Sequence, residues 1–331
     1  ADKHVENNGR RKTGYEWGTN PCSEIILRNN QFCNLTEVVV RSTDTFATLQ
    51  NKVRLATILG TIQSTYTKFP YLRKVWAKNT EEERLLGVSL TGIMDCEITV
   101  APEPEFLEEL RNISVDTNKE WADKLGIPQS AAITCVKPSG TVSQLVDAGS
   151  GIHARHSPYY IRTVRGDVKD PLTQLMIDEG VPAEPEVFHP DSTMVFSFPV
   201  KSPDNAVTRN DMTALEQLEV WKLYAVNWCE HKPSVTISVR DDEWLEVGAW
   251  VYKNFDLCSG ISFLPHSDHT YQQAPYQDCD EETYEELLSR MPASIDWSRL
   301  ASMTEIQQED NTAGSQTLAC VAGVCEVVDL N

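Results

Sequence analysis

Apolar positions in the chain recur with two periods, one typical of helices and one typical of strands. Helical spacing begins after an Asp at residue 44 and ends before Pro70, and it recurs in four later segments. Short apolar or alternating runs between these segments predict strands. The predicted helices are 44–69, 104–125, 171–179, 212–230 and 242–255, and the predicted strands are 86–92, 131–136, 194–200, 234–239 and 259–264.

Strands that alternate with helices predict parallel βαβ units, and therefore an α/β fold with five such strands. The composition changes near residue 301, where Thr, Gln, Gly and Ser become frequent, as in flexible linkers. We expect a catalytic body over 1–300 and a flexible tail over 301–331. The tail ends with Cys320 and Cys325, and twenty extended residues span up to about 65 Å, so this dithiol would reach a distant site.

Composition excludes several classes of protein. The chain has 331 residues, 40% of them hydrophobic, which is enough for a substantial core. The net charge of −20 is spread through helical segments, which argues against duplex nucleic acid as a partner. The basic residues that remain candidates for holding a nucleotide's phosphates are Lys137, Arg155, Arg162 and Arg165.

Cysteine usage indicates the compartment. Nine cysteines occur without a secretory h-region and without an apolar run of 18 residues. This combination predicts a cytoplasmic protein with no membrane segment, whose cysteines are free or redox-active.

The segment Asn20-Pro21-Cys22-Ser23-Glu24-Ile25 is the strongest candidate for chemistry. Pro21 favours extended backbone before it, so the sequence predicts that Asn20, Cys22 and Glu24 alternate and share one face. The thiol would donate or abstract a hydrogen atom, the carboxylate would take a proton from a hydroxyl, and the amide would orient that hydroxyl. Spacing alone fits a buried cysteine at a strand start equally well.

A second candidate lies between a predicted strand and a short helical stretch. Its glycine permits close backbone approach, its hydroxyls offer hydrogen bonds, and free N–H groups at a helix start favour phosphate. An ordinary strand-to-helix turn is the alternative interpretation, and the G-x-x-x-x-G-K spacing of a Walker motif is absent. The candidate substrate-binding residues are Pro138, Ser139, Gly140, Thr141, Val142 and Ser143.

The hexapeptide around Cys22, together with Cys33, resembles the finger loop of ribonucleotide reductases. The resemblance is strongest to the adenosylcobalamin-dependent (class II) ribonucleoside-triphosphate reductases. The tail pair Cys320 and Cys325 fits the same family. Further segments that resemble it, in the family's order, are 136–143, 151–153, 159–162, 260–265 and 273–276.

The resemblance implies a fold as well as an activity. Reductases of this family resemble a ten-stranded α/β barrel whose two halves flank the finger loop. This chain would hold the loop, near 19–34, and the second half of the barrel. Its start, without Met and about twenty residues before the loop, leads us to expect a fragment whose N-terminal half is missing.

The resemblance also implies the roles of residues in an oxidoreductase. Cys22 would carry a thiyl radical, Glu24 would act as a general base, and Asn20 would hold the sugar hydroxyls of a ribonucleoside triphosphate. Cys33 would be one member of the reducing dithiol, with its partner in the missing half. Cys320 and Cys325 would relay electrons from thioredoxin, and adenosylcobalamin would be the cofactor.

No metal ligands are expected from the chain itself. The Asp-x-His-x-x-Gly pattern that supplies a histidine to cobalt in many cobalamin mutases is absent, so the cofactor would keep its own base. Polar-contact roles are predicted for His153, His156, His266 and His269. Core packing is predicted for Cys96, Cys135, Cys229, Cys258 and Cys279.

Two other interpretations remain open. One is a half-barrel that binds a nucleotide or cobalamin without catalysis, and the other is a fragment of a class I reductase large subunit that receives its radical from another protein. The intact set of redox cysteines favours the enzyme.

Overall fold

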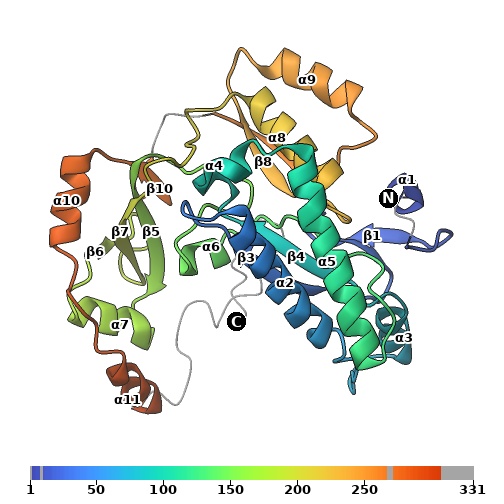
Figure 1. Cartoon of the computed structure of the whole chain (residues 1–331). Coiled ribbons are helices and arrows are strands. Elements are labelled where there is room, and N and C mark those ends of the chain that lie inside the picture. The colour runs from blue at the N-terminus through green and yellow to red at the C-terminus, as the bar shows by residue number, and fades with distance from the viewer. Residues whose placement is uncertain (1, 8–9, 267–270, 307–331) are drawn as a thin grey trace. The chain divides into compact units, whose positions relative to one another are not determined.

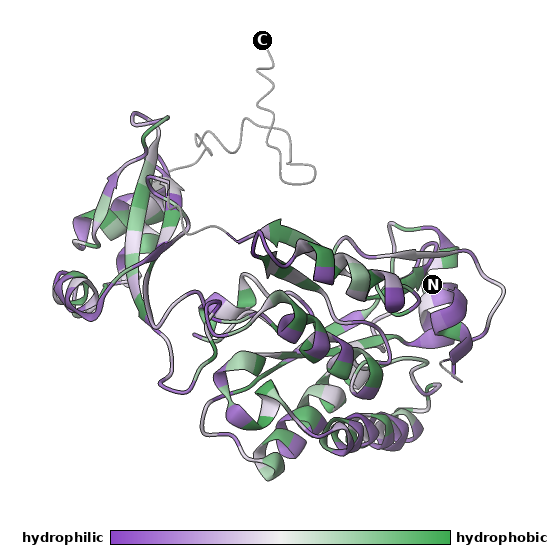
Figure 2. Ribbon diagram, turned by 90° about the horizontal axis from the view of Figure 1, so that it is seen from above, coloured by the Kyte–Doolittle hydropathy of each residue, from purple (hydrophilic) through white to green (hydrophobic). Residues whose placement is uncertain are grey.

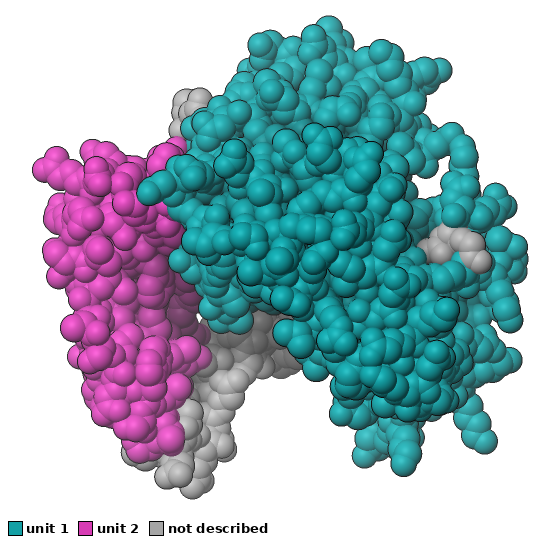
Figure 3. Space-filling view, in the orientation of Figure 1, with its two compact units in different colours: residues 1–155, 203–267 teal, residues 156–202, 268–331 magenta. Residues whose placement is uncertain are grey.

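The computed structural model describes residues 2–7, 10–266 and 271–306. The chain forms two compact units, coloured separately in Figure 3. Unit 1 comprises residues 1–155 and 203–267, and unit 2 comprises residues 156–202 and 268–331. Sequence analysis treated residues 1–300 together and did not anticipate this division.

Unit 1 is built on parallel strands. β3 (Asn34–Val39) pairs with β4 (Leu86–Thr91), and β8 (Val235–Val239) pairs with β9 (Ile261–Pro265). Two isolated parallel bridges join these pairs through residues 131–136. The bridges are Val88 with Thr134 and Val136 with Pro233. Five parallel segments therefore follow one another in the order β3, β4, 131–136, β8 and β9, which confirms the α/β class.

Helices of unit 1 cover these strands, and α2 packs against β3, β4 and α5 (Figure 1). α5 has the predicted bounds because Pro104 occupies its first turn and Gly126 closes it in the left-handed conformation. α2 begins after Thr45, whose side chain accepts the Thr48 N–H, rather than after the expected Asp44 cap. The long helices are α2 (Phe46–Gln63), α3 (Lys74–Glu83), α5 (Pro104–Leu125), α8 (Ala214–Asn227) and α9 (Trp244–Lys253), and the short ones are α1 (Asp2–Asn7), η1 (Ile93–Asp95), α4 (Glu97–Val100) and α6 (Val142–Leu145).

The core of unit 1 lies between α8 and the strands. Trp221, Tyr224 and Trp228 are fully buried. The Trp221 indole N–H donates to the Pro233 carbonyl at 3.0 Å, and the Trp228 N–H donates to the Cys135 carbonyl at 2.8 Å. α8 is therefore fixed to the segments that carry the site. The helix ribbons in Figure 2 carry both hydrophobic and hydrophilic bands, as expected for helices with one buried face.

Unit 2 has an antiparallel sheet in the order β10-β5-β7-β6. The predicted strand 194–200 exists as β7, but its expected place in the parallel set is wrong, because it pairs antiparallel with β5 and β6. The elements are β5 (Tyr159–Asp167), α7 (Pro171–Asp178), β6 (Ala183–Pro185), β7 (Thr193–Lys201), β10 (Tyr276–Asp278), α10 (Glu281–Ser289) and α11 (Ser298–Ile306). Among the described residues of the chain, no helix has the length and apolar character needed to cross a bilayer.

Candidate active site

Residues 20–25 form the turn of a β-hairpin between β1 (Trp17–Thr19) and β2 (Ile26–Arg28). The Asn20 N–H donates to the Ile25 carbonyl at 3.2 Å, and Asn20 Oδ1 accepts the Ile25 N–H at 2.9 Å. Ser23 adopts a left-handed φ of 61°. An Asn whose side chain closes the loop, followed by Pro, favours a turn over extended backbone.

The turn gives its two reactive side chains opposite environments. The Cys22 residue is exposed and its thiol is free, whereas the Glu24 side chain is completely buried. The predicted extended row that put Asn20, Cys22 and Glu24 on one face is therefore wrong. Cys22 and Glu24 remain close enough to one cation, Lys137, for both to act electrostatically on it.

Lys137 connects the turn to the third parallel segment. Its ammonium forms an ion pair with Glu24 Oε1, and its backbone N–H donates to Ser89 Oγ at 3.0 Å. Burial disfavours the charged ammonium, but the hydrogen bond and charge of Glu24 outweigh burial and raise the pKa of Lys137. Lys137 is also one of the predicted candidates for holding phosphate, and that role stays a prediction. No local pattern could reveal this pairing, because 113 residues separate the two partners.

The backbone of the turn is fixed to the starts of β8 and β9. The Lys232 N–H donates to the Glu24 carbonyl at 2.9 Å. Gly260 has a φ of +65°, and a Cβ there would lie 3.0 Å from the Pro233 carbonyl oxygen and 3.3 Å from that of Cys22. Only glycine fits this position without strain, which explains the glycine that opens the 260–265 motif.

Cys33 lies immediately before β3. The residue as a whole is partly exposed, but its sulfur is enclosed, and burial raises the pKa of the thiol to about 12 against the opposing charge of Lys137. The Cys33 and Cys135 sulfurs lie 3.3 Å and 3.5 Å from the point where a Cβ on Gly87 would stand. Cys135 is buried, as predicted, but its proximity to Cys33 was missed because the two share no motif.

The candidate phosphate loop contains an unexpected carboxylate contact. Ser139 adopts a φ of 52°, and its hydroxyl donates to Glu37 Oε1, which also accepts from Ser89 Oγ at 3.2 Å. Burial raises the pKa of Glu37, and the two hydroxyl donors oppose this shift. Glu37 belongs to β3, a strand that sequence analysis did not predict. The role of residues 138–143 in binding phosphate stays a prediction.

The 151–153 motif packs against the backbone at the start of this loop. Gly151 has a φ of +58°, and a Cβ there would lie 2.2 Å from the Lys137 carbonyl oxygen. His153 Nδ1 lies 2.7 Å from the Ser150 carbonyl, and its Nε2 accepts the Thr236 N–H at 3.0 Å. Burial lowers the pKa of His153, so the imidazole is neutral with both nitrogens engaged. The predicted polar-contact role of His153 is confirmed.

The arginines considered for phosphate binding have other partners. Buried Arg155, one of the candidates for phosphate, holds Asp95 through two hydrogen bonds of 2.7 and 2.8 Å. In unit 2, Arg162 donates to the Pro275 carbonyl at 3.0 Å and lies 4.4 Å from the centre of the Tyr276 ring. The 159–162 and 273–276 motifs therefore meet in the antiparallel sheet, where β5 pairs with β10.

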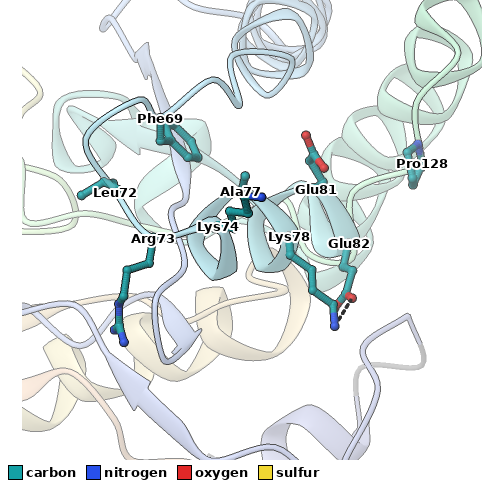
Figure 4. A pocket seen from close by; sticks show the side chains of 9 residues that line it. All are labelled: Phe69, Leu72, Arg73, Lys74, Ala77, Lys78, Glu81, Glu82 and Pro128. Atoms are coloured by element: carbon teal, nitrogen blue, oxygen red, sulfur yellow. Dashed lines mark ion pairs between the residues drawn. The ribbon is translucent and has the colours of Figure 1, made fainter.

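A cavity of about 600 Å³ lies on α3, and none of the predicted site residues lines it. Figure 4 shows Lys78 turned toward Glu82 at its rim, consistent with their ion pair. Within the described ranges, no group of three His, Cys, Asp or Glu side chains could hold a metal ion. Cys320, Cys325 and His269 lie outside the described residues.

No protein-family model matches the chain. Three individual proteins that match it are all named as the same kind of enzyme. The chain is 27% identical to the adenosylcobalamin-dependent ribonucleoside-triphosphate reductase of Lactobacillus gasseri, over 88% of this chain and 44% of that protein. The enzyme of the same name from Lactobacillus delbrueckii is 26% identical (97% and 48%), and that of Euglena gracilis is 29% identical (92% and 42%).

A solved structure, that of a B12-dependent (class II) ribonucleotide reductase, matches the fold with a TM-score of 0.72. The identity is 25%, over 88% of this chain and 44% of that one. The chain thus spans less than half the length of the curated relatives it matches. Sequence and fold agree, and over most of its length the chain is similar to adenosylcobalamin-dependent (class II) ribonucleotide reductases.

Proposed function

We propose that this chain is the part of an adenosylcobalamin-dependent ribonucleoside-triphosphate reductase that carries the radical cysteine and one redox cysteine. The overall reaction replaces the 2′-hydroxyl of a ribonucleoside triphosphate by hydrogen, releases water, and oxidises two thiols to a disulfide. The observation that carries the proposal is the exposed Cys22 thiol on a fixed turn, next to the buried Glu24–Lys137 pair. The enclosed Cys33 thiol, near the same Lys137, supplies the second function.

Two observations fit the proposed cofactor. An exposed thiol can be reached by a large ligand from the solvent side. His153, with both ring nitrogens engaged, offers no ligand to cobalt, which fits a cofactor that keeps its own base. When bound, adenosylcobalamin supplies a carbon radical by homolysis of its Co–C bond.

The chain's own residues account for the later steps. The Cys22 thiyl radical takes the hydrogen atom from C3′ of the ribose, and the Glu24 carboxylate accepts the proton of the 3′-hydroxyl. Lys137 pairs with Glu24 and so places a positive charge beside the carboxylate that would act as the base. Asn20 Oδ1 is used within the turn, which leaves its amide nitrogen to bind a sugar hydroxyl.

The C2′–O bond then breaks, and the hydroxyl takes a proton from the reducing dithiol and leaves as water. Cys33 and a second thiol, proposed to lie in the other half of the barrel, supply that proton, the hydrogen that enters C2′ and two electrons, and become a disulfide, while Glu24 returns its proton to the 3′ oxygen. Cys22 returns its hydrogen atom to C3′ and is ready for another cycle. The 138–143 loop is proposed to hold the phosphates, and Cys320 and Cys325 to reduce the disulfide with electrons from thioredoxin.

Replacing Cys22 by Ser tests the proposal in the complete enzyme, reconstituted with the proposed other half. Cys22→Ser should abolish deoxyribonucleotide formation, because an O–H bond does not give up its hydrogen atom as an S–H bond does. Nucleotide affinity should stay nearly unchanged, since the substitution is close to isosteric. Cys279→Ser, in unit 2, is the matched control and should retain activity. Turnover above a few per cent in Cys22→Ser would refute the assignment.

The proposed tail relay has its own test. Changing both Cys320 and Cys325 to Ser should block turnover driven by thioredoxin, yet leave one round of reduction by pre-reduced enzyme. Undiminished rates with thioredoxin would show that the tail is not the relay.

A further inference from the structure

A cavity of about 450 Å³ lies in unit 1 where α1, α5 and the end of α8 approach the segments that lead into β8 and β9. Cationic side chains dominate its charged lining, although the chain as a whole carries a net charge of −20. None of the predicted site residues lines it. The residues important here are His4, Arg10, Arg111, Cys229, Glu230 and Lys232.

Lys232 is the most informative of these residues. It is only 6% exposed, and its ammonium donates one hydrogen bond, to the Leu257 carbonyl at 3.1 Å. No acidic residue in the described part of the chain forms an ion pair with it, and burial lowers the pKa of Lys232. An ammonium has three donors, and a buried cation without a counter-charge is costly. The cavity therefore contains a cation whose hydrogen-bonding capacity is incompletely used.

The acidic residue of the cavity is engaged by other groups. Glu230 pairs with Arg10, and Glu230 Oε2 also accepts the Ile133 N–H at 2.9 Å. Arg111 donates to the Val226 carbonyl at 3.1 Å and lies 3.9 Å from a half-exposed Glu108. Three cations thus surround one carboxylate, and among them Lys232 is the cation with no acidic partner in the described part of the chain.

The histidine of the cavity adds no charge at neutral pH. His4 Nε2 lies 2.8 Å from the Glu230 carbonyl, and burial, with the charge of Lys232, lowers the pKa of His4 to about 4. A neutral imidazole does not compete with an anion, and it can take part in hydrogen bonding.

We propose that this cavity is a binding site for a phosphate-type oxyanion, either inorganic phosphate or the phosphate group of a nucleotide, with Lys232 as its main ligand. A dianion would accept the unused ammonium donors of Lys232 and balance the excess charge. The volume lies within the range of small-molecule sites, about 300 to 1,000 Å³. This inference does not depend on the proposed reductase function.

Ligand-dependent thermal unfolding of the 331-residue chain tests the proposal. Inorganic phosphate should raise the unfolding temperature in a concentration-dependent manner. Lys232→Met should weaken phosphate binding at least about tenfold, the effect expected for losing a charge-assisted hydrogen bond. Lys253→Met, on the exposed side of α9, is the matched control and should bind phosphate as the wild type does.

Loss of folding will not obscure the result. Lys232→Met removes a buried, uncompensated charge, so without phosphate it should unfold at the same temperature as the wild type or higher. A second arm replaces phosphate by a nucleoside triphosphate, which distinguishes a free anion from a nucleotide. Dependence on Lys232 in either arm supports the site.

Lys137→Met separates this cavity from the 138–143 loop. Anion binding that is lost in Lys137→Met and kept in Lys232→Met would belong to the loop and would overturn the proposal. The absence of stabilisation by both probes, or equal binding by Lys232→Met and wild type, would also overturn it.

Discussion

The hairpin turn at 20–25 and the start of β3 each present one cysteine, and the two thiols differ in almost every physical respect. Cys22 is exposed, whereas burial raises the pKa of Cys33 to about 12. Transfer of a hydrogen atom does not require a thiolate, so the role proposed for Cys22 needs access rather than acidity. In the reducing role proposed for Cys33, a protonated thiol retains the proton that must accompany its electrons. The two proposed roles therefore differ by environment and not by residue type.

Removing the proposed base, Glu24, should produce the largest effect. Glu24→Gln should lower the single-turnover rate of the reconstituted enzyme by about 10²- to 10⁴-fold, the usual contribution of a general base. Glu246→Gln, in the first turn of α9, serves as the control and should react at the wild-type rate. A loss smaller than about tenfold would remove Glu24 from the base role.

Thiol labelling sharpens the comparison directly. At pH 8 a thiol with a pKa of about 12 is only about 10⁻⁴ ionised, against about a quarter for an unperturbed thiol. Peptide mass spectrometry after iodoacetamide treatment should show Cys33 modified at least about 10³-fold more slowly than an unperturbed exposed thiol. Because the pKa is raised, the Cys33 rate should keep increasing with pH beyond pH 9. Equal rates at Cys22 and Cys33 would contradict the proposed difference in environment.

The smallest predicted effect is a loss of folding stability when the packing beside Cys33 is disturbed. An Ala at 87 would place its Cβ 2.4 Å from a Leu35 methyl and close to the Cys33 sulfur. Gly87→Ala should therefore lower the free energy of unfolding by about 1–3 kcal/mol, the typical cost of overpacking. Gly18→Ala, in β1 beside the turn, meets no atom within 4 Å and should be neutral or slightly stabilising. Urea unfolding of both variants measures the contrast, and equal costs would contradict it.

Local signals explain which parts of the fold were predictable. The sequence signals both ends of α5, because Pro104 marks its start and Gly126 marks its end. β3 was missed because Thr36 and Glu37 interrupt its apolar pattern, and Glu37 meets its partners Ser139 and Ser89 only in the folded structure. The pairing partners of β7 could not be predicted, because strand orientation depends on the path of the chain and not on the composition of the strand.

Only the part of the candidate site that lies within one short segment of sequence could be predicted. Cys22 and Glu24 were identified from one hexapeptide, but their orientation was wrong because the turn depends on the Asn20 side chain. Lys137 and Glu37 act on residues more than a hundred positions away, so no window of sequence contains both partners.

The anchoring of the turn affects how the protein folds during synthesis. The turn at 20–25 is made well before the residues that hold its backbone, which are Lys232 and Ser259; the Ser259 hydroxyl donates to the Ser23 carbonyl at 3.3 Å across 236 residues. Contacts of such long range form late, because closing the intervening loop is entropically expensive. Cys22 therefore stays on an unanchored hairpin until nearly all of unit 1 has emerged from the ribosome. A site assembled this way becomes ordered only after the segments that surround it are present.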